Sequence, residues 1–116
     1  MTGAQIAEMV AVVTFTFRDE TELQEALGHI LEGAGLTVER EVKLNGTDRI
    51  DFVVGRVGIE VKVGGAGLNV ARQLQRYARS DRIDEILLIS HAARHTALPA
   101  EIGGKPLNVV WIGGGL

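Results

Sequence analysis

The chain has 116 residues, of which 46% are hydrophobic and 23% are charged, and its formal net charge is −3. This composition is typical of one globular domain and excludes a disordered segment or a globally basic protein that coats nucleic acid. The sequence has no cysteine, no apolar run of about 18 residues and no signal peptide with a basic start, which excludes disulfides, thiolate metal sites and a transmembrane helix. We therefore expect a single cytoplasmic domain with no membrane partner.

Residues 3–17 are compatible with two structures. Up to Val13 the apolar residues recur at helical spacing, whereas residues 12–17 alternate between apolar and polar side chains as in a strand. We expect a short helix that leads into an extended segment. Either structure would present an apolar surface suited to dimerisation.

Residues 19–34 predict an amphipathic helix. Asp19 is placed to cap its N-terminus, with Glu22 three residues later as in a capping box, and Gly35 ends it. The apolar positions of this helix fall on one face: Leu23, Ala26, Leu27, Ile30, Leu31 and Ala34.

Three strands are predicted after this helix, over residues 36–44, 49–54 and 57–63. The pair Asn45-Gly46 is a strong turn signal between the first two strands. Gly55 opens the turn between the second and third, where a two-residue type II′ loop needs a positive φ angle at its first central position.

The second of these turns sets a register in which Asp51 lies opposite Glu60. Because side chains alternate across a strand, Lys62 lies on the same face as these two carboxylates. Like charges that face each other destabilise a sheet unless a cation lies between them, and Mg²⁺ or Mn²⁺ with oxygen ligands would serve. The ordinary alternative is a half-exposed hairpin with a solvated polar face. The opposite, apolar face holds Ile50, Phe52, Ile59, Val61 and Val63.

Residues 64–67 are mostly glycine and predict a mobile turn; no Gly-Lys-Ser/Thr sequence follows, as a P-loop would require. A second helix is predicted from Gly67 or Asn69 to about Ser80. Its buried stripe consists of Val70, Ala71, Leu74 and Ala78, its outward face holds Arg72, Arg76 and Arg79, and Gln73 and Tyr77 flank the stripe.

The last third of the chain predicts two more strands. Residues 84–90 form a near-continuous apolar run, as in a parallel strand buried on both faces, and residues 107–112 form the last strand before a tail at 113–115. Trp111 is expected in the core or in an interface. His91 and His95 have the spacing of a zinc-binding pair, but the glutamate of an HExxH motif and a third ligand are missing, which disfavours zinc.

The spacing of Asp51, Glu60 and Lys62 resembles that of the PD-(D/E)XK nuclease superfamily, which includes Holliday-junction resolvases, restriction endonucleases and RecB-like exonucleases. The proline that names the motif is absent before Asp51. Gln73 and Tyr77 match the QxxxY motif of RecB-like members, in which these residues orient the site and bind the substrate strand.

The resemblance implies a restriction-endonuclease-like α/β fold. Its αβββαβ core would cover residues 19–112, with a mixed central sheet flanked by helices, and residues 1–18 would form a preceding element. It also implies Mg²⁺ or Mn²⁺ as cofactor, held by Asp51, Glu60 and the carbonyl oxygen of Val61. Further candidate ligands come from the first helix: Glu22 in the first place, with the cap as its alternative role, or else Glu20 or Glu25.

The resemblance further implies a Mg²⁺-dependent nuclease that hydrolyses phosphodiester bonds in DNA, as a homodimer, in repair or recombination. An endonuclease for junctions or flaps is favoured over an exonuclease, and RNA as substrate stays open. Lys62 would position the attacking water or stabilise the transition state. The alternative is a non-catalytic nucleic-acid-binding or assembly module on the same fold. The expected substrate contacts are Arg72, Arg76, Arg79, Gln73 and Tyr77.

Overall fold

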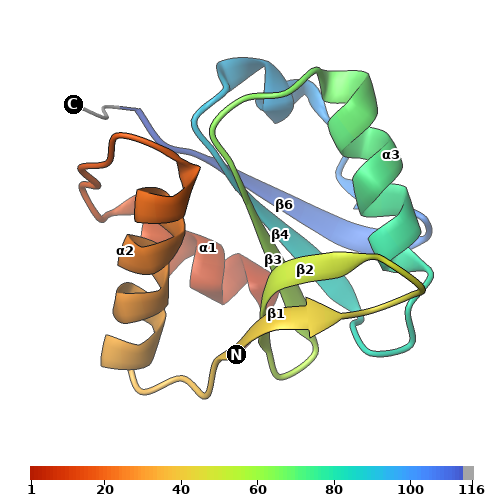
Figure 1. The fold of residues 1–116 in the computed structure, drawn as a ribbon, viewed down its shortest axis with the longest axis horizontal. Coiled ribbons are helices and arrows are strands. Elements are labelled where there is room, and N and C mark those ends of the chain that lie inside the picture. The colour runs from red at the N-terminus through yellow and green to blue at the C-terminus, as the bar shows by residue number, and fades with distance from the viewer. Residues whose placement is uncertain (114–116) are drawn as a thin grey trace.

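The computed structural model describes residues 1–113 of the chain (Figure 1). The helices are α1 (Gly3–Ala11), α2 (Glu20–Gly33) and α3 (Gly67–Ala78), with a short 3₁₀ helix η1 (Ala93–Ala97). The strands are β1 (Glu39–Lys43), β2 (Arg49–Val54), β3 (Val57–Lys62), β4 (Glu85–Ser90), β5 (Glu101–Ile102) and β6 (Lys105–Trp111).

Within residues 1–113 the strands form one mixed sheet in the order β1-β2-β3-β4-β6-β5. The pairs β1–β2, β2–β3 and β5–β6 are antiparallel, whereas β3–β4 and β4–β6 are parallel. Helices α1 and α2 cover one face of the sheet and α3 covers the other (Figure 1). The predicted α/β class, with a mixed sheet flanked by helices and the order αβββαβ from α2 to β4, is confirmed.

Apolar side chains form a core on each face of the sheet. Leu23, Leu27 and Leu31 of α2 pack on one face, and Val70 and Leu74 of α3 pack on the other. Strand β4 supplies alternate residues to both cores and is buried along both faces, as its continuous apolar run predicts.

The N-terminal segment adopts the helix followed by an extended stretch that the sequence predicts. Residues 13–17 form no strand, and Phe15 and Phe17 alternate into the core under α2 together with Ile6 and Val10 of α1. The apolar side of this segment is therefore buried inside the chain. This packing leaves Val12, at 84% exposed, as an apolar surface residue of the segment and gives no support to the expected use of the segment in dimerisation.

Smaller differences concern the ends of elements. The strand predicted over residues 36–44 begins only at Glu39, and Trp111 is 51% exposed, so it does not belong to the core. The predicted tail at 113–115 lies, beyond Gly113, outside the described residues. No helix in the described part of the chain has the length and apolar character needed to cross a membrane.

Candidate active site

The hairpin of β2 and β3 carries the predicted catalytic cluster. Its register pairs Phe52 with Ile59, as expected, and Gly55 has the positive φ angle (60°) that the turn requires. However, Ile50 packs in the core under α3, whereas Phe52 packs in the core under α2. Residues two apart on a regular strand share a face, so the alternation is interrupted at Asp51. The prediction that Ile50 and Phe52 share a face is wrong.

The neighbouring strand is irregular at the same level. Glu41 of β1 lies between the paired positions Arg40–Phe52 and Val42–Ile50, and its φ angle is +50°, which is uncommon for a residue other than glycine. The local backbone distortion of β1 and β2 therefore centres on Glu41 and Asp51, beside the candidate site.

Asp51 and Glu60 are bound to each other's strands. The backbone N–H of Asp51 donates to Glu60 Oε1 at 3.1 Å, and the backbone N–H of Val61 donates to Asp51 Oδ2 at 2.8 Å. Each carboxylate thus accepts a hydrogen bond from a backbone N–H that would donate to a backbone carbonyl oxygen in a regular sheet. The two acids are cross-strand neighbours, and each holds the other strand in place.

Lys62 supplies the cluster's positive charge. Its Nζ atom lies 3.4 Å from Glu60 Oε2, and its side chain is 21% exposed, whereas Glu60 is buried. Burial, followed by the charge of Asp51, raises the pKa of Glu60 to about 8, although Lys62 acts to lower it. Burial also raises the pKa of Asp51 to about 6, with smaller contributions from Glu41 and Glu20. Two ionised carboxylates would exceed the single positive charge of Lys62, so the cluster binds a proton more readily than two isolated acids would.

Tyr77 and Gln73 of α3 support Glu60 from the opposite side. The buried Tyr77 hydroxyl lies 3.2 Å from Glu60 Oε2 and 3.0 Å from the carbonyl oxygen of Arg49, and Gln73 Nε2 donates to it at 2.8 Å. Burial, followed by the charge of Glu60, raises the pKa of Tyr77, so the phenol stays protonated. Its single proton serves one of its two acceptors at a time. A protonated Glu60 would donate to Tyr77 and leave the tyrosine proton for Arg49, so every bond would be satisfied.

Of the first-helix acids, Glu20 lies nearest to Lys62. Glu20 Oε1 accepts a hydrogen bond from the backbone N–H of Val63 at 3.1 Å, and Glu20 lines the same cavity as Lys62. Glu25 instead lines a smaller hollow together with Asp51 and Glu41, so Asp51 borders this hollow, whereas Glu20 and Lys62 border the larger cavity.

Glu22, the favoured candidate ligand, lies in the first turn of α2, which Asp19 caps by accepting from the Glu22 N–H. The Glu22 carboxylate pairs with Arg18 at 2.6 Å and also accepts from the Arg18 backbone N–H, so it does not complete the capping box with the N–H of Asp19. These contacts hold Glu22 to Arg18 and do not bring it to the cluster. The helical wheel leaves Glu20 and Glu22 equivalent, because only the packing of α2 on the sheet decides which of them reaches β3.

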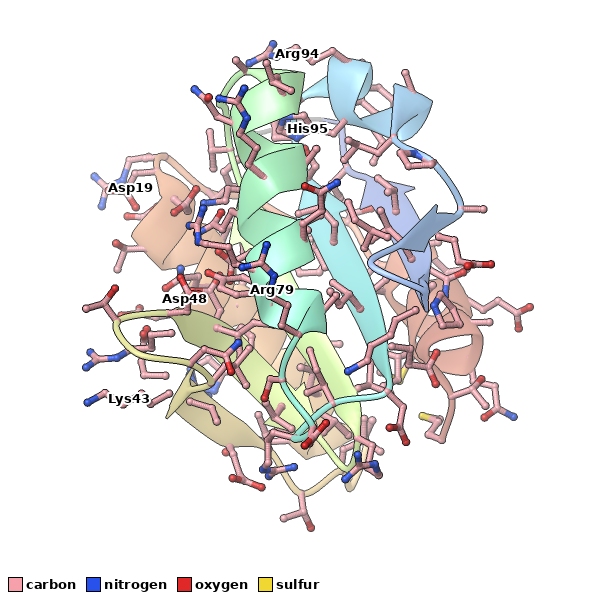
Figure 2. All side chains as sticks on the ribbon, turned by 90° about the vertical axis from the view of Figure 1, so that its right-hand side faces the viewer. Asp19, Lys43, Asp48, Arg79, Arg94 and His95 are labelled. Carbon is pink, nitrogen blue, oxygen red and sulfur yellow. The ribbon has the colours of Figure 1, made fainter. Side chains whose placement is uncertain are left out.

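A cavity of about 500 Å³ adjoins the cluster, a volume within the range of small-ligand sites. Two of the predicted arginines, Arg72 and Arg76, line it, and Arg76 Nε is also 3.1 Å from Asp48 Oδ1. Arg79 lies at the far end of α3, outside this cavity (Figure 2). The remaining lining residues are Glu20, Lys62, Gly64, Gly65, Ala66, Asn69, Val70 and Gln73.

The glycine turn on the cavity rim is fastened by two side chains. The carbonyl oxygen of Gly65 accepts from Arg94 Nε and from His95 Nε2, both at 2.9 Å. His95 Nδ1 is 2.6 Å from Ser90 Oγ in the buried interior. Figure 2 shows Arg94 and His95 at the end of α3 where the helix begins. The sequence alone does not reveal this anchor, because it joins residues about 30 positions apart.

His91 and His95 do not form the zinc pair that their spacing suggested. His91 Nδ1 lies 2.8 Å from the carbonyl oxygen of Ile112, and His95 is occupied by Ser90 and Gly65. Among residues 1–113, no three His, Cys, Asp or Glu side chains are gathered as a preformed metal site. Comparison of the chain with models of known protein families, with curated proteins and with solved structures finds no match.

Proposed function

We propose that the protein is a divalent-metal-dependent nuclease of the PD-(D/E)XK type that acts on DNA. The observation that carries this proposal is the interlocked pair Asp51–Glu60 with Lys62 beside it, because Lys62 links this pair to a cavity that two arginines also line. The hydrogen bonds of the two acids join the strands, but a purely structural hairpin does not need two acids that repel each other with a lysine beside them. A site that stabilises developing charge on a phosphodiester needs both the acids and the lysine.

The donor set suits Mg²⁺ or Mn²⁺. Both side chains offer oxygen atoms only, and their raised pKa values mean that the cluster takes up a proton where no other cation balances it. The cation would be held by Asp51, Glu60 and the Val61 carbonyl oxygen, with Glu20 as a further ligand. When bound, it would neutralise charge on the phosphate and activate water for attack.

The chain's own residues have separable roles. Lys62 directs its ammonium group into the cavity and would stabilise the negative charge of the transition state. Tyr77, held by Gln73, fixes the Glu60 carboxylate from behind. Arg72 and Arg76 would hold the phosphates of the substrate strand.

A non-catalytic nucleic-acid-binding module is the second candidate. The absence of a preformed three-ligand metal group among residues 1–113 favours it, because such a module needs only Arg72 and Arg76. However, a binding module does not explain why two acids that repel each other, Asp51 and Glu60, are placed side by side in the sheet. The two candidates differ in whether DNA is cut.

The deciding experiment incubates the purified protein with Mg²⁺ or Mn²⁺ and with labelled single-stranded, duplex, flap and four-way-junction DNA. We expect metal-dependent cleavage that EDTA stops, and loss of cleavage with retained binding in Lys62→Ala. Lys43→Ala is the matched control, since Lys43 lies exposed on β1, away from the cavity (Figure 2). Salt-dependent binding without cleavage in either metal would establish the binding module instead.

A further inference from the structure

The two edges of the sheet differ in how they are protected. The β1 edge carries Glu39, Arg40, Glu41 and Lys43 on five residues, and the left-handed backbone at Glu41 interrupts it. Charges and kinks of this kind prevent a sheet edge from pairing with another chain. At the other edge, β5 pairs with Lys105 and Pro106 and the N–H of Leu107 donates to the carbonyl oxygen of Ala100, so among residues 1–113 no strand pairs with the outer side of β6 beyond Leu107.

The pairing of β6 with β4 determines which backbone N–H and C=O groups of β6 point outward, away from the sheet. The N–H of Ile112 donates to the carbonyl oxygen of Ser90, so the N–H groups of Val110 and Asn108, two and four residues earlier, also point toward β4. The N–H groups of Val109 and Trp111 therefore point away from it. Neither of them donates to any group within residues 1–113.

The side chains at this edge are equally unprotected. From Leu107 to Ile112 there is neither a charged residue nor a proline, in contrast to β1. Trp111 is 51% exposed although its neighbours Val110 and Ile112 are buried. Val109 lies two residues from Trp111 and so shares its face of the sheet.

We propose that β6 pairs antiparallel with β6 of a second copy of this chain, about a two-fold axis at Val110. This register places Val109 of each copy opposite Trp111 of the other copy. Since both residues point their N–H and C=O groups outward, each of these two pairs forms two hydrogen bonds. The same register places each Trp111, whose indole N–H donates to the carbonyl oxygen of its own His91 at 3.2 Å, opposite a valine of the other copy, a favourable cross-strand combination.

The edge favours a second copy over an unrelated peptide because it is complementary to itself. Leu107 also points outward, but its N–H is bonded to Ala100, and the two outward residues beyond it, Val109 and Trp111, lie symmetrically on either side of Val110. One two-fold axis therefore satisfies all four of the pairing residues. No charge of the segment 107–112 meets its own image across the axis. The surface lies away from the cavity, and the pairing does not depend on the proposed nuclease activity.

The test is sedimentation equilibrium over a wide range of protein concentration. We expect a monomer–dimer equilibrium for the unmodified chain and a dissociation constant at least about tenfold weaker for Trp111→Lys. Val12→Lys is the matched control, because Val12 is 84% exposed in the turn after α1 and gains the same charge. It should dimerise like the unmodified chain.

Hydrogen exchange of the unmodified chain tests the register without any substitution. The amides of Val109 and Trp111 should become protected as the protein concentration rises. A monomer at every concentration would overturn the proposal. A dimer in which these two amides exchange at the monomer's rate, or one that Trp111→Lys leaves intact in a folded protein, would overturn it as well.

Discussion

The backbone amide of Asp51 donates a 3.1 Å hydrogen bond to the carboxylate of Glu60, so an acid of the proposed site also serves as part of the sheet. Asp51 returns the interaction by accepting from the amide of Val61. Positioning of both acids therefore depends on hydrogen bonding, whereas their proposed chemistry depends on charge. Substitutions that keep one property and remove the other separate the two roles.

Glu60→Gln should keep the fold and abolish activity. The amide side chain retains an oxygen for the Asp51 N–H and offers an N–H to Tyr77, while the repulsion between the two acids disappears. We expect unchanged or higher stability and a loss of cleavage of about 100-fold or more. Glu60→Ala leaves the Asp51 N–H without its partner and should cost about 1–3 kcal/mol in the free energy of unfolding. Urea denaturation of the two variants measures the difference; equal stabilities would contradict this role of Glu60.

Stability of the metal-free protein should fall as the pH rises from about 4 to about 8. The folded-state pKa values of Asp51 (about 6) and Glu60 (about 8) lie above their ordinary values of 3.8 and 4.5, so the folded state binds more protons over this range. The stabilisation is complete at low pH and is lost as the pH passes through the raised pKa values. Denaturation midpoints measured across this range check the sign. Glu60→Gln should flatten the upper part of the curve, and a flat curve for the unmodified protein would contradict the raised pKa values.

Divalent metal should stabilise the fold through Glu20 and not through Glu22. At a free Mg²⁺ or Mn²⁺ concentration about 100 times the dissociation constant, the expected gain is about 2.7 kcal/mol. Glu20→Gln should reduce this gain, because Glu20 lies beside Val63 and Lys62. Glu22→Gln is its matched control: it weakens the pair with Arg18 and should leave the metal response intact. Thermal melts with metal and with EDTA provide the comparison, and the reverse result would restore Glu22 as the ligand.

The three arginines of α3 should not contribute equally to DNA binding. Arg72→Ala and Arg76→Ala should each weaken binding and lower the slope of log affinity against log salt by up to about 0.9 for each duplex phosphate that the variant no longer neutralises. Arg79→Ala should change neither quantity, since Arg79 lies outside the cavity. Titrations at several salt concentrations measure the slopes. An equal loss in all three variants would mean that the outer face of α3 binds DNA.

The register of the central hairpin could be predicted from sequence because it depends on a local feature. The glycine at position 55 fixes the turn, and the turn fixes the pairing of Phe52 with Ile59. The interruption at Asp51 could not be predicted in the same way. It depends on the carboxylate of Glu60, nine residues away, which takes the place of a main-chain acceptor.

The choice among the first-helix acids could not be made from sequence for a related reason. Amphipathic spacing identifies the buried face of α2, and that prediction agrees with Leu23, Leu27 and Leu31 in the core. Spacing does not tell how the helix is placed along the sheet, and this placement brings Glu20 to Val63. The burial of Tyr77, which the sequence suggested to be partial, likewise depends on how closely α3 approaches Glu60.

The distorted β1 strand determines how large an assembly of this chain can become. A dimer joined through β6 would present two β1 strands at its outer edges, each with the left-handed backbone at Glu41 and charges on both sides of it. Head-to-tail addition of β1 to β6 would generate an open filament, and these features oppose it. Assembly of the chain should therefore stop at two copies and form a closed dimer, not a fibre.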